Sequence, residues 1–432
     1  MTTIPMLRLR SRYLVAVAIA LFVVFRLWAY PSPDPWLPGP GQQHDHPQHS
    51  QPNGQPTAQQ PSVLPVNSTL GFGRIYVVSK EDSPRRHSLL QAANVTELDF
   101  TIPIQPNWTE SDLEGHTKIG RGSLLAWLGH LHSLREFLDS GAETALILED
   151  DVDWDIRLRS LQAPLVASAV RTLLASTTPV SSLPSTPSTA DFSTDVVADP
   201  AIDADADADA NATRYPYGDP AAWDLLYLGH CGDYWHPIDV GFKDGHVRPS
   251  DLAARPHISF NDASLPDPKN LHPWTASLLE NLGVAPHTRL VHKSVFPLCT
   301  FAYAVTRTSA RRLLKELSLD GRGEDEPMAY DVAILISCRD SDDMRCYSVN
   351  PELFHHLPGK SMISGIDNHT NIPPVDDTGR EQAELRHETP NINCGFWNGA
   401  FTFQNGDSRR LARLREEVGR KGRCLKSGRD LP

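Results

Sequence analysis

The clearest pattern in the chain is an alternation of strand-length apolar runs with stretches of helical period. Residues 74–79 form the first expected strand, and residues 145–148 are a continuous apolar run, which is typical of a strand covered on both faces. Between them, residues 122–139 carry apolar side chains at spacings of three and four and end before Gly141, which predicts an amphipathic helix. Strands that alternate with helices favour an α/β fold with a mostly parallel sheet and flanking helices.

The same alternation continues through the second half of the chain. We expect strands at residues 224–228, 301–306 and 345–349 and helices at residues 309–317 and 330–337. A short helix is also expected from Ser83, with Pro84 in its first turn. No glycine-rich phosphate loop follows the first strand, which removes the usual dinucleotide-binding and P-loop classes.

The N-terminal 70 residues differ in composition from the rest. In residues 1–30, Arg8, Arg10 and Arg12 precede the one long apolar run, which predicts a cytoplasmic tail and a signal anchor; a cleaved signal peptide is the rival interpretation. Residues 31–70 are rich in Pro, Gln, His and Ser, the composition of an unfolded stalk. The expected location is the Golgi or endoplasmic reticulum membrane as a single-pass type II protein, with the folded domain lumenal, or secretion if the apolar segment is cleaved.

A second unfolded segment is expected as an insert at about residues 175–220. It contains seven Asp and no Lys or Arg between residues 191 and 209, so it carries about half of the formal net charge of -13. The folded remainder is nearly balanced in charge, and no basic or aromatic arrangement suggests nucleic acid as a partner. The expected folded domain therefore covers residues 71–365 around the insert, followed by a C-terminal extension at residues 366–432.

Cysteines and glycosylation triplets agree with exposure to an oxidising lumen. The six cysteines are even in number and all follow the apolar run, although their pairing cannot be read from the sequence. They include no CxxC spacing, which argues against a structural zinc site. Five N-glycosylation triplets begin at Asn67, Asn94, Asn107, Asn211 and Asn368.

The apolar strand at residues 145–148 leads directly into an acidic cluster, Glu149-Asp150-Asp151-Val152-Asp153. In open α/β sheets, ligands bind beyond the carboxyl ends of the strands. Four carboxylates at such an end repel one another and attract a cation, and their oxygen atoms suit Mg²⁺, Mn²⁺ or Ca²⁺. The alternative is a solvated acidic loop that caps the next helix.

Several of these elements occur in the order seen in glycosyltransferase family 25. They are Leu128-Gly129-His130 on the helix, the segment Ala145 to Val152 (ALILEDDV), the strand and helix formed by residues 301–305 and 310–314, and Tyr330-Asp331. The chain resembles a divergent, fungal-type member of this family, which includes bacterial lipopolysaccharide galactosyltransferases and animal procollagen galactosyltransferases. The resemblance implies a GT-A-like fold and inverting transfer of a sugar, with galactose expected, from a UDP-sugar to a glycan or glycoprotein hydroxyl.

The resemblance also implies roles for the acidic residues. It assigns metal contact to Asp151 and contact with the ribose or a metal-bound water to Asp150, and it leaves Glu149 turned into the sheet end. Asp151 and Asp153 form an Asp-x-Asp pair, which we expect to hold Mn²⁺ or Mg²⁺ at the leaving diphosphate. A third ligand is expected late in the domain. His355 and its neighbour His356 are the nearest candidates, with His355 taken as the ligand and a plain surface His pair as the alternative.

Two further residues are candidates for the site. Inverting transfer needs a carboxylate base on the acceptor hydroxyl. Asp331 matches the family's late Asp before a helix, although a helix N-cap is an equally good interpretation. His130 is expected on the donor side, with a buried core histidine as the alternative.

Two other classes of protein fit the same acidic cluster. An inactive transferase-like lumenal sugar-binding protein would keep the strand and lose the metal, and a calcium-stabilised domain would use the carboxylates without catalysis. The complete acidic cluster favours the enzyme. The expected partners are therefore a nucleotide sugar, a glycan or glycoprotein acceptor, and a membrane through one N-terminal helix.

Overall fold

The computed structural model describes residues 65–113, 119–177, 213–233, 235, 247–319, 329–340, 344–357 and 380–426. All of them belong to one compact unit, Pro61–Pro432. The expected anchor, most of the stalk, residues 178–212 of the insert, and the glycosylation triplets at Asn211 and Asn368 lie outside the described residues. Among the described helices, none has the length and apolar character of a membrane span.

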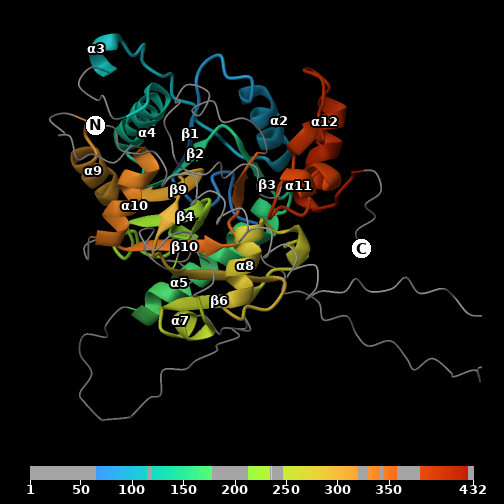
Figure 1. Ribbon diagram of the computed structural model, residues 1–432. Helices are drawn as coiled ribbons and strands as arrows, with labels where there is room; N and C mark the ends of the chain where they lie inside the picture. The colour runs from blue at the N-terminus through green and yellow to red at the C-terminus, as the bar shows by residue number, and fades with distance from the viewer. Residues whose placement is uncertain are drawn as a thin grey trace, which may run out of the picture. The chain divides into compact units, whose positions relative to one another are not determined.

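A mixed sheet of seven strands forms the centre of this unit (Figure 1), in the order β1-β2-β9-β4-β10-β7-β6. In that order the strands are Arg74–Val78, Thr144–Glu149, Ala302–Thr306, Leu225–Gly229, Cys346–Asn350, Thr288–Lys293 and His257–Asn261. Five strands run in one direction, while β9 and β7 run against them. The expected mostly parallel sheet is confirmed in part: most strands share one direction, but only β1 with β2 and β4 with β10 pair in parallel, and the other neighbouring strands of this sheet pair antiparallel.

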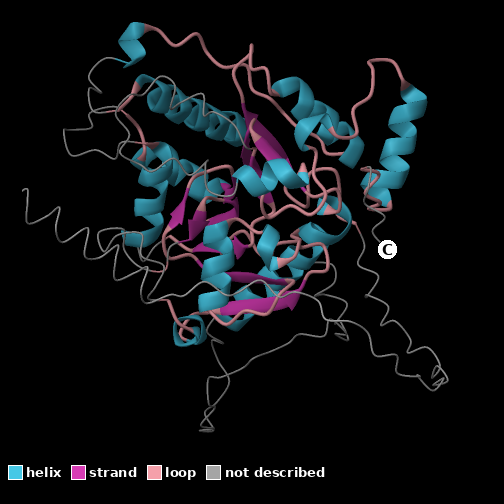
Figure 2. Cartoon of the chain, turned by 45° about the vertical axis from the view of Figure 1, so that its right-hand side comes forward, coloured by secondary structure: helices cyan, strands magenta, loops and turns pink. Residues whose placement is uncertain are grey.

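Helices cover both faces of the sheet, which explains the strands without polar alternation (Figure 2). Leu146 and Leu148 of β2 belong to a core shared with α2 and α5, whereas Ala145 and Ile147 belong to the opposite core, shared with α4, α9 and α10. These helices are Arg86–Thr96 (α2), Ala163–Thr177 (α5), Arg121–Asp139 (α4), Arg307–Glu316 (α9) and Tyr330–Asp340 (α10). The α/β layering expected from the sequence is thus present.

Short elements complete the unit. Two small ladders pair β3 (Val152–Trp154) with β11 (Phe354–His356) and β5 (Gly232–Asp233) with β8 (Pro297–Leu298). The remaining helices are α3 (Glu110–Leu113), α7 (Pro249–Ala253), α8 (Pro273–Asn281), α11 (Arg380–Arg386) and α12 (Ser408–Leu414), the last continuing into a π-helical turn at Arg415–Arg420.

The ordered domain extends beyond the limits expected from composition. The backbone N–H of Val66 donates to the carbonyl of Arg159 at 3.2 Å, and Leu70 is fully buried, so the end of the expected stalk is folded. At the other boundary, Tyr217 stacks on Phe72 with ring centroids 4.3 Å apart, inside the range assigned to the insert. Composition is an average over a window of residues. It therefore misplaces a domain boundary that depends on one buried side chain, such as Leu70 or Tyr217.

The C-terminal extension is part of the same fold. The N–H of Ile156 donates to the carbonyl of Cys394 at 3.0 Å, and Val418 packs against Val95 of α2. All six cysteines are paired, as Cys231–Cys299, Cys338–Cys346 and Cys394–Cys424. The last of these bridges closes the extension on itself, and residues 389–397 pack beside β3.

Candidate functional site

Two neighbouring parallel strands bring the first pair of site residues together. Val78 of β1 is the register partner of Glu149 of β2, so the residues that follow them, Ser79 and Asp150, leave the sheet side by side. The Ser79 hydroxyl donates to Asp150 Oδ2 at 2.6 Å. Burial raises the pKa of Asp150, and hydrogen bonds from Ser79 and Ser83 offset part of that rise.

Asp151 is buried between two cationic partners. Its Oδ2 accepts from Arg85 at 2.6 Å and lies 3.0 Å from Nε2 of His356. Burial alone would raise the pKa of this carboxyl, but the charges of His356 and Arg85 outweigh burial and hold the pKa well below its ordinary value. Arg85 also lies 3.9 Å from Asp150. The expected mutual repulsion of the carboxylates is therefore compensated within the chain.

The second carboxylate oxygen of Asp151 has no hydrogen-bond partner among the described residues. This oxygen, Oδ1, is buried. A buried acceptor without a partner is uncommon in folded proteins and marks a place where a ligand, an ion or water completes the site. This oxygen is the strongest local indication that the acidic end of β2 receives something from outside.

Asp153 does not take part in this site, contrary to the expected Asp-x-Asp metal pair. Its carboxylate accepts from Thr389 Oγ1 at 2.7 Å, from the N–H of Phe396 at 2.8 Å and from the N–H of Trp397 at 3.3 Å. Gly395 packs so closely on this carboxylate that a Cβ there would overlap Oδ2. Asp153 therefore anchors the C-terminal extension.

The expected ligand His355 also faces elsewhere. Its Nδ1 is hydrogen-bonded to Oε1 of the buried Glu352, which also accepts from Asn391 at 2.7 Å. Although burial opposes it, the charge of His355 lowers the pKa of Glu352 to about 2. His355 and Asp153 are register partners of β11 and β3, so both lie on the same side of that ladder, and His356 points to the opposite side, toward Asp151.

A second polar cluster surrounds Glu149 on the α4 side of the sheet end. His130 Nε2 lies 3.6 Å from Glu149 Oε1, and Thr300 Oγ1 donates to the same oxygen at 2.9 Å. The other ring nitrogen of His130 is 3.1 Å from the Tyr303 hydroxyl. His130 is 2 % exposed and stacks on Tyr330, so it is a core histidine that also reaches the edge of the site.

Asp331 lies next to this cluster, in the first turn of α10. Its Oδ1 accepts from the N–H of Val332 at 2.9 Å. Burial raises the pKa of Asp331, as does the charge of Glu149, whereas His130 acts in the opposite direction. Asp331 is the second residue of α10 and contacts the N–H of its immediate neighbour, so the N-cap contact is not present. The raised pKa beside the acidic strand end agrees with the other interpretation.

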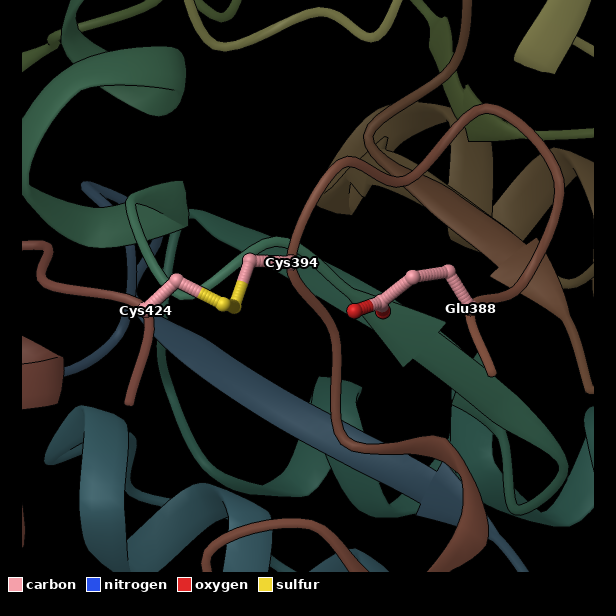
Figure 3. Close-up of side chains that lie close together, drawn as sticks. All are labelled: Glu388, Cys394 and Cys424. Carbon is pink, nitrogen blue, oxygen red and sulfur yellow. A yellow bond between two sulfur atoms is a disulfide. The ribbon is translucent and has the colours of Figure 1, made fainter. Parts of the chain in front are cut away.

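The expected three-ligand metal set of Asp151, Asp153 and His355 is not assembled. Among the described residues, three or more candidate ligand side chains converge only at Glu388, Cys394 and Cys424 (Figure 3). The two sulfurs are bonded to each other there and offer no thiolate. A divalent ion at the β2 end would instead be held by Asp151 Oδ1 and Asp150, together with oxygen atoms of a bound phosphate group.

Sequence reasoning missed Ser79, Arg85 and Glu352. Ser79 had a usable signal, because it directly follows the strand that pairs in parallel with β2. Arg85 lies in a turn before α2, which begins at Arg86 rather than at Ser83, and nothing in its local pattern indicates Asp151 as its partner.

No protein-family model matches the sequence, and comparison with the curated proteins gives no match either.

Proposed function

We propose that this protein is an inverting glycosyltransferase that moves a hexose, with galactose expected, from a UDP-sugar to a hydroxyl of a glycan or glycoprotein. The mixed α/β sheet is compatible with a GT-A-like fold, and its acidic strand end lies where such sheets bind ligands. The observation that carries the proposal is the unpartnered Oδ1 of Asp151, buried beside Asp150 and Arg85 at this edge.

The donor side is assigned to Asp150, Asp151 and Arg85. Their charges of both signs suit a nucleotide diphosphate, because a guanidinium pairs with phosphate oxygens while the carboxylates take the ribose hydroxyls or a cation. Mn²⁺ or Mg²⁺, held by Asp151 Oδ1 and Asp150, would supply Lewis-acid stabilisation of the leaving diphosphate. Ser79 and Ser83 fix the orientation of Asp150 through the hydrogen bonds described above.

The acceptor side is assigned to Asp331. The acceptor hydroxyl oxygen forms the new bond to the anomeric carbon, the bond from that carbon to the diphosphate breaks, and the hydroxyl proton passes to the Asp331 carboxylate. A carboxyl whose pKa is raised by burial is a better base than an exposed one, which supports this role. Glu149 and His130 act as positioning residues, because their charges set the environment of Asp331.

The test uses the purified full chain with a panel of nucleotide sugars in the presence of Mn²⁺. We expect consumption of UDP-galactose, with release of UDP and inversion at the anomeric carbon of the product. Asp331→Asn should lower kcat by about 10²- to 10⁴-fold, the usual contribution of a general base, with UDP affinity unchanged. Asp151→Asn should lower both turnover and Mn²⁺-dependent UDP binding.

Asp139→Asn is the matched control. Asp139 is an exposed carboxylate at the far end of α4, so its loss should change turnover by less than about twofold, in line with the small effects of surface substitutions. If no nucleotide sugar is consumed and UDP does not bind, the transferase proposal is wrong. Stabilisation by Ca²⁺ without turnover would favour a calcium-stabilised lumenal protein.

A further inference from the structure

A pocket in the C-terminal extension carries cations that the proposed transfer does not use. Its volume is about 940 Å³. The cations that line it are Arg386, Arg409, Arg410, Arg413 and Lys426. Among the lining residues, Asp407 is the one carboxylate. The pocket therefore has a clear excess of positive charge, which favours an anionic ligand.

The positive charges of the α12 arginines are not neutralised by carboxylates among the described residues. Arg409 and Arg413 are exposed, and their side chains make no hydrogen bond or ion pair with any described residue. They are four residues apart on the helix and so lie on the same side of it. Arg410 donates through Nε to the carbonyl of Thr402 at 2.6 Å, a neutral acceptor that leaves its charge in place. A guanidinium group presents paired N–H donors that match sulfate and carboxylate oxygens.

The same pocket has an apolar wall formed by Trp397, Phe401 and Leu425. Leu425 is 45 % exposed. The loop that carries the two aromatic residues has left-handed backbone at Asn398 and at Phe401, with φ values of 61° and 60°. Asn adopts this conformation readily, but it is unfavourable for Phe, and such strained residues tend to occur at binding sites, where the surrounding structure maintains them.

Parts of the lining are fixed to one another before any ligand arrives. The Cys394–Cys424 bridge ties the segment with Leu425 and Lys426 to the start of the aromatic loop. Lys426 is further held by an ion pair of 2.7 Å with the buried Glu388. A preformed pocket binds without the entropic cost of ordering its own segments.

We propose that this pocket binds an acidic oligosaccharide, with sulfate or carboxylate groups on Arg409 and Arg413 and the apolar face of a sugar ring on Trp397. The aromatic wall distinguishes this ligand from an acidic peptide, which would need the cations alone. None of Glu149, Asp150 and Asp151 lines the pocket, and binding there requires no sugar transfer, so the inference can be tested independently of the proposed activity.

The experiment measures binding of a sulfated hexasaccharide to the full chain by isothermal titration calorimetry. A neutral hexasaccharide of the same length, polyglutamate and UDP are titrated in parallel. The charge variant is the double substitution Arg409→Gln with Arg413→Gln. Its control is Arg135→Gln with Arg311→Gln, which removes the same charge from exposed positions on α4 and α9. Trp397→Phe tests the aromatic wall and keeps the backbone contact of residue 397 with Asp153.

We expect the sulfated hexasaccharide to bind the parent and the neutral one to bind at least about tenfold more weakly, because charge-assisted hydrogen bonds are about twice as strong as neutral ones. The charge variant should lose at least about tenfold in affinity for the same reason, whereas the control pair should change affinity less than about twofold, since distant surface charges are largely screened. Trp397→Phe should lower the affinity for the sulfated hexasaccharide and leave the affinity for polyglutamate unchanged.

Three outcomes overturn the proposal. Equal losses in the charge variant and in the control pair would mean diffuse charge attraction rather than a site. If polyglutamate binds as tightly as the hexasaccharide, and Trp397→Phe changes the affinity of neither ligand, the pocket is a surface for acidic peptides. Loss of UDP affinity in the charge variant would assign the pocket to the nucleotide. Equal thermal unfolding of all variants excludes misfolding as the cause of any loss.

Discussion

Replacement of Asp151 by Asn separates two accounts of the acidic strand end. If the carboxylates mainly repelled one another, removal of one charge would leave the protein as stable as the parent or more so. The structure instead places Asp151 against Arg85 and His356, at 2.6 and 3.0 Å. Asp151→Asn removes the negative partner of both groups and turns an amide N–H toward one of them, so we expect a loss of stability.

The size of the loss follows from the lowered pKa. A carboxyl whose pKa falls from 3.8 to about 2 on folding contributes about 2 kcal/mol at neutral pH. Removal of one member of a buried ion pair costs about 3–5 kcal/mol where both charges are buried. The Arg85 side chain is 20 % exposed, which places the expected loss at the lower end, about 2–3 kcal/mol.

The pH dependence has a definite sign. Because the folded pKa of Asp151 is below the unfolded value, its contribution is fully present above the unfolded pKa and is lost as pH falls from about 4 through about 2. The difference in unfolding free energy between parent and Asp151→Asn should therefore not shrink through titration of Asp151 between pH 7.5 and pH 5.

The assay is urea unfolding of parent, Asp151→Asn and the exposed control Asp139→Asn across this pH range. The control should remain within about 0.5 kcal/mol of the parent, as expected for a surface substitution. A variant at position 151 that equals or exceeds the parent in stability without added metal would refute the ion-pair account and restore repulsion as the dominant interaction.

Three further predictions concern the fold. Removal of residues 1–60 should leave a protein that stays in solution without detergent, because the compact unit begins at Pro61; a requirement for detergent would contradict this. Replacement of residues 178–212 by a short Gly-Ser linker should cost less than about 1 kcal/mol in urea unfolding, since loop length matters weakly and the two flanks are already joined by the hydrogen bond from Arg171 to the carbonyl of Pro216; a loss above about 2 kcal/mol would show that the insert packs on the domain. Arg289→Met should cost about 3–5 kcal/mol in the same assay, because it leaves the fully buried Asp262 without its partner at 2.7 Å. The double variant that adds Asp262→Asn should recover part of that loss, and no recovery would mean that packing of Arg289, rather than its charge, matters.

The sequence predicted those parts of the fold whose information is local. β2 and α4 were expected within one or two residues of their observed bounds. The continuous apolar run of a strand buried on both faces and the apolar period of a helix are each contained in one segment. β6 and β7 were missed. β7 carries Arg289, which is fully buried because it pairs with Asp262, so the strand does not appear apolar in the sequence.

In the candidate site, too, the sequence predicted only what local sequence contains. Asp150 and Asp151 could be identified from their position after a buried strand. The orientation of Asp153 and His355 could not be, because their partners lie in segments that only the fold brings together: Asp153 bonds to residues more than 230 positions later. Spacing of the Asp-x-Asp type gives the order of residues along the chain but not the face to which each side chain turns.

The attachment of Asp153 and Asp155 to residues 389–397 also sets an order of events during synthesis. Asp155 accepts from the N–H of Cys394, and Asp153 accepts from Phe396, so both carboxylates wait for partners some 240 residues away. At a translation rate of 5–20 residues per second, that wait is roughly 10–50 s. During this time the strand that leads to Asp151 has been translated, but residues 389–397, which pack beside β3, have not. A segment translated late therefore completes the hydrogen bonding of a segment translated much earlier.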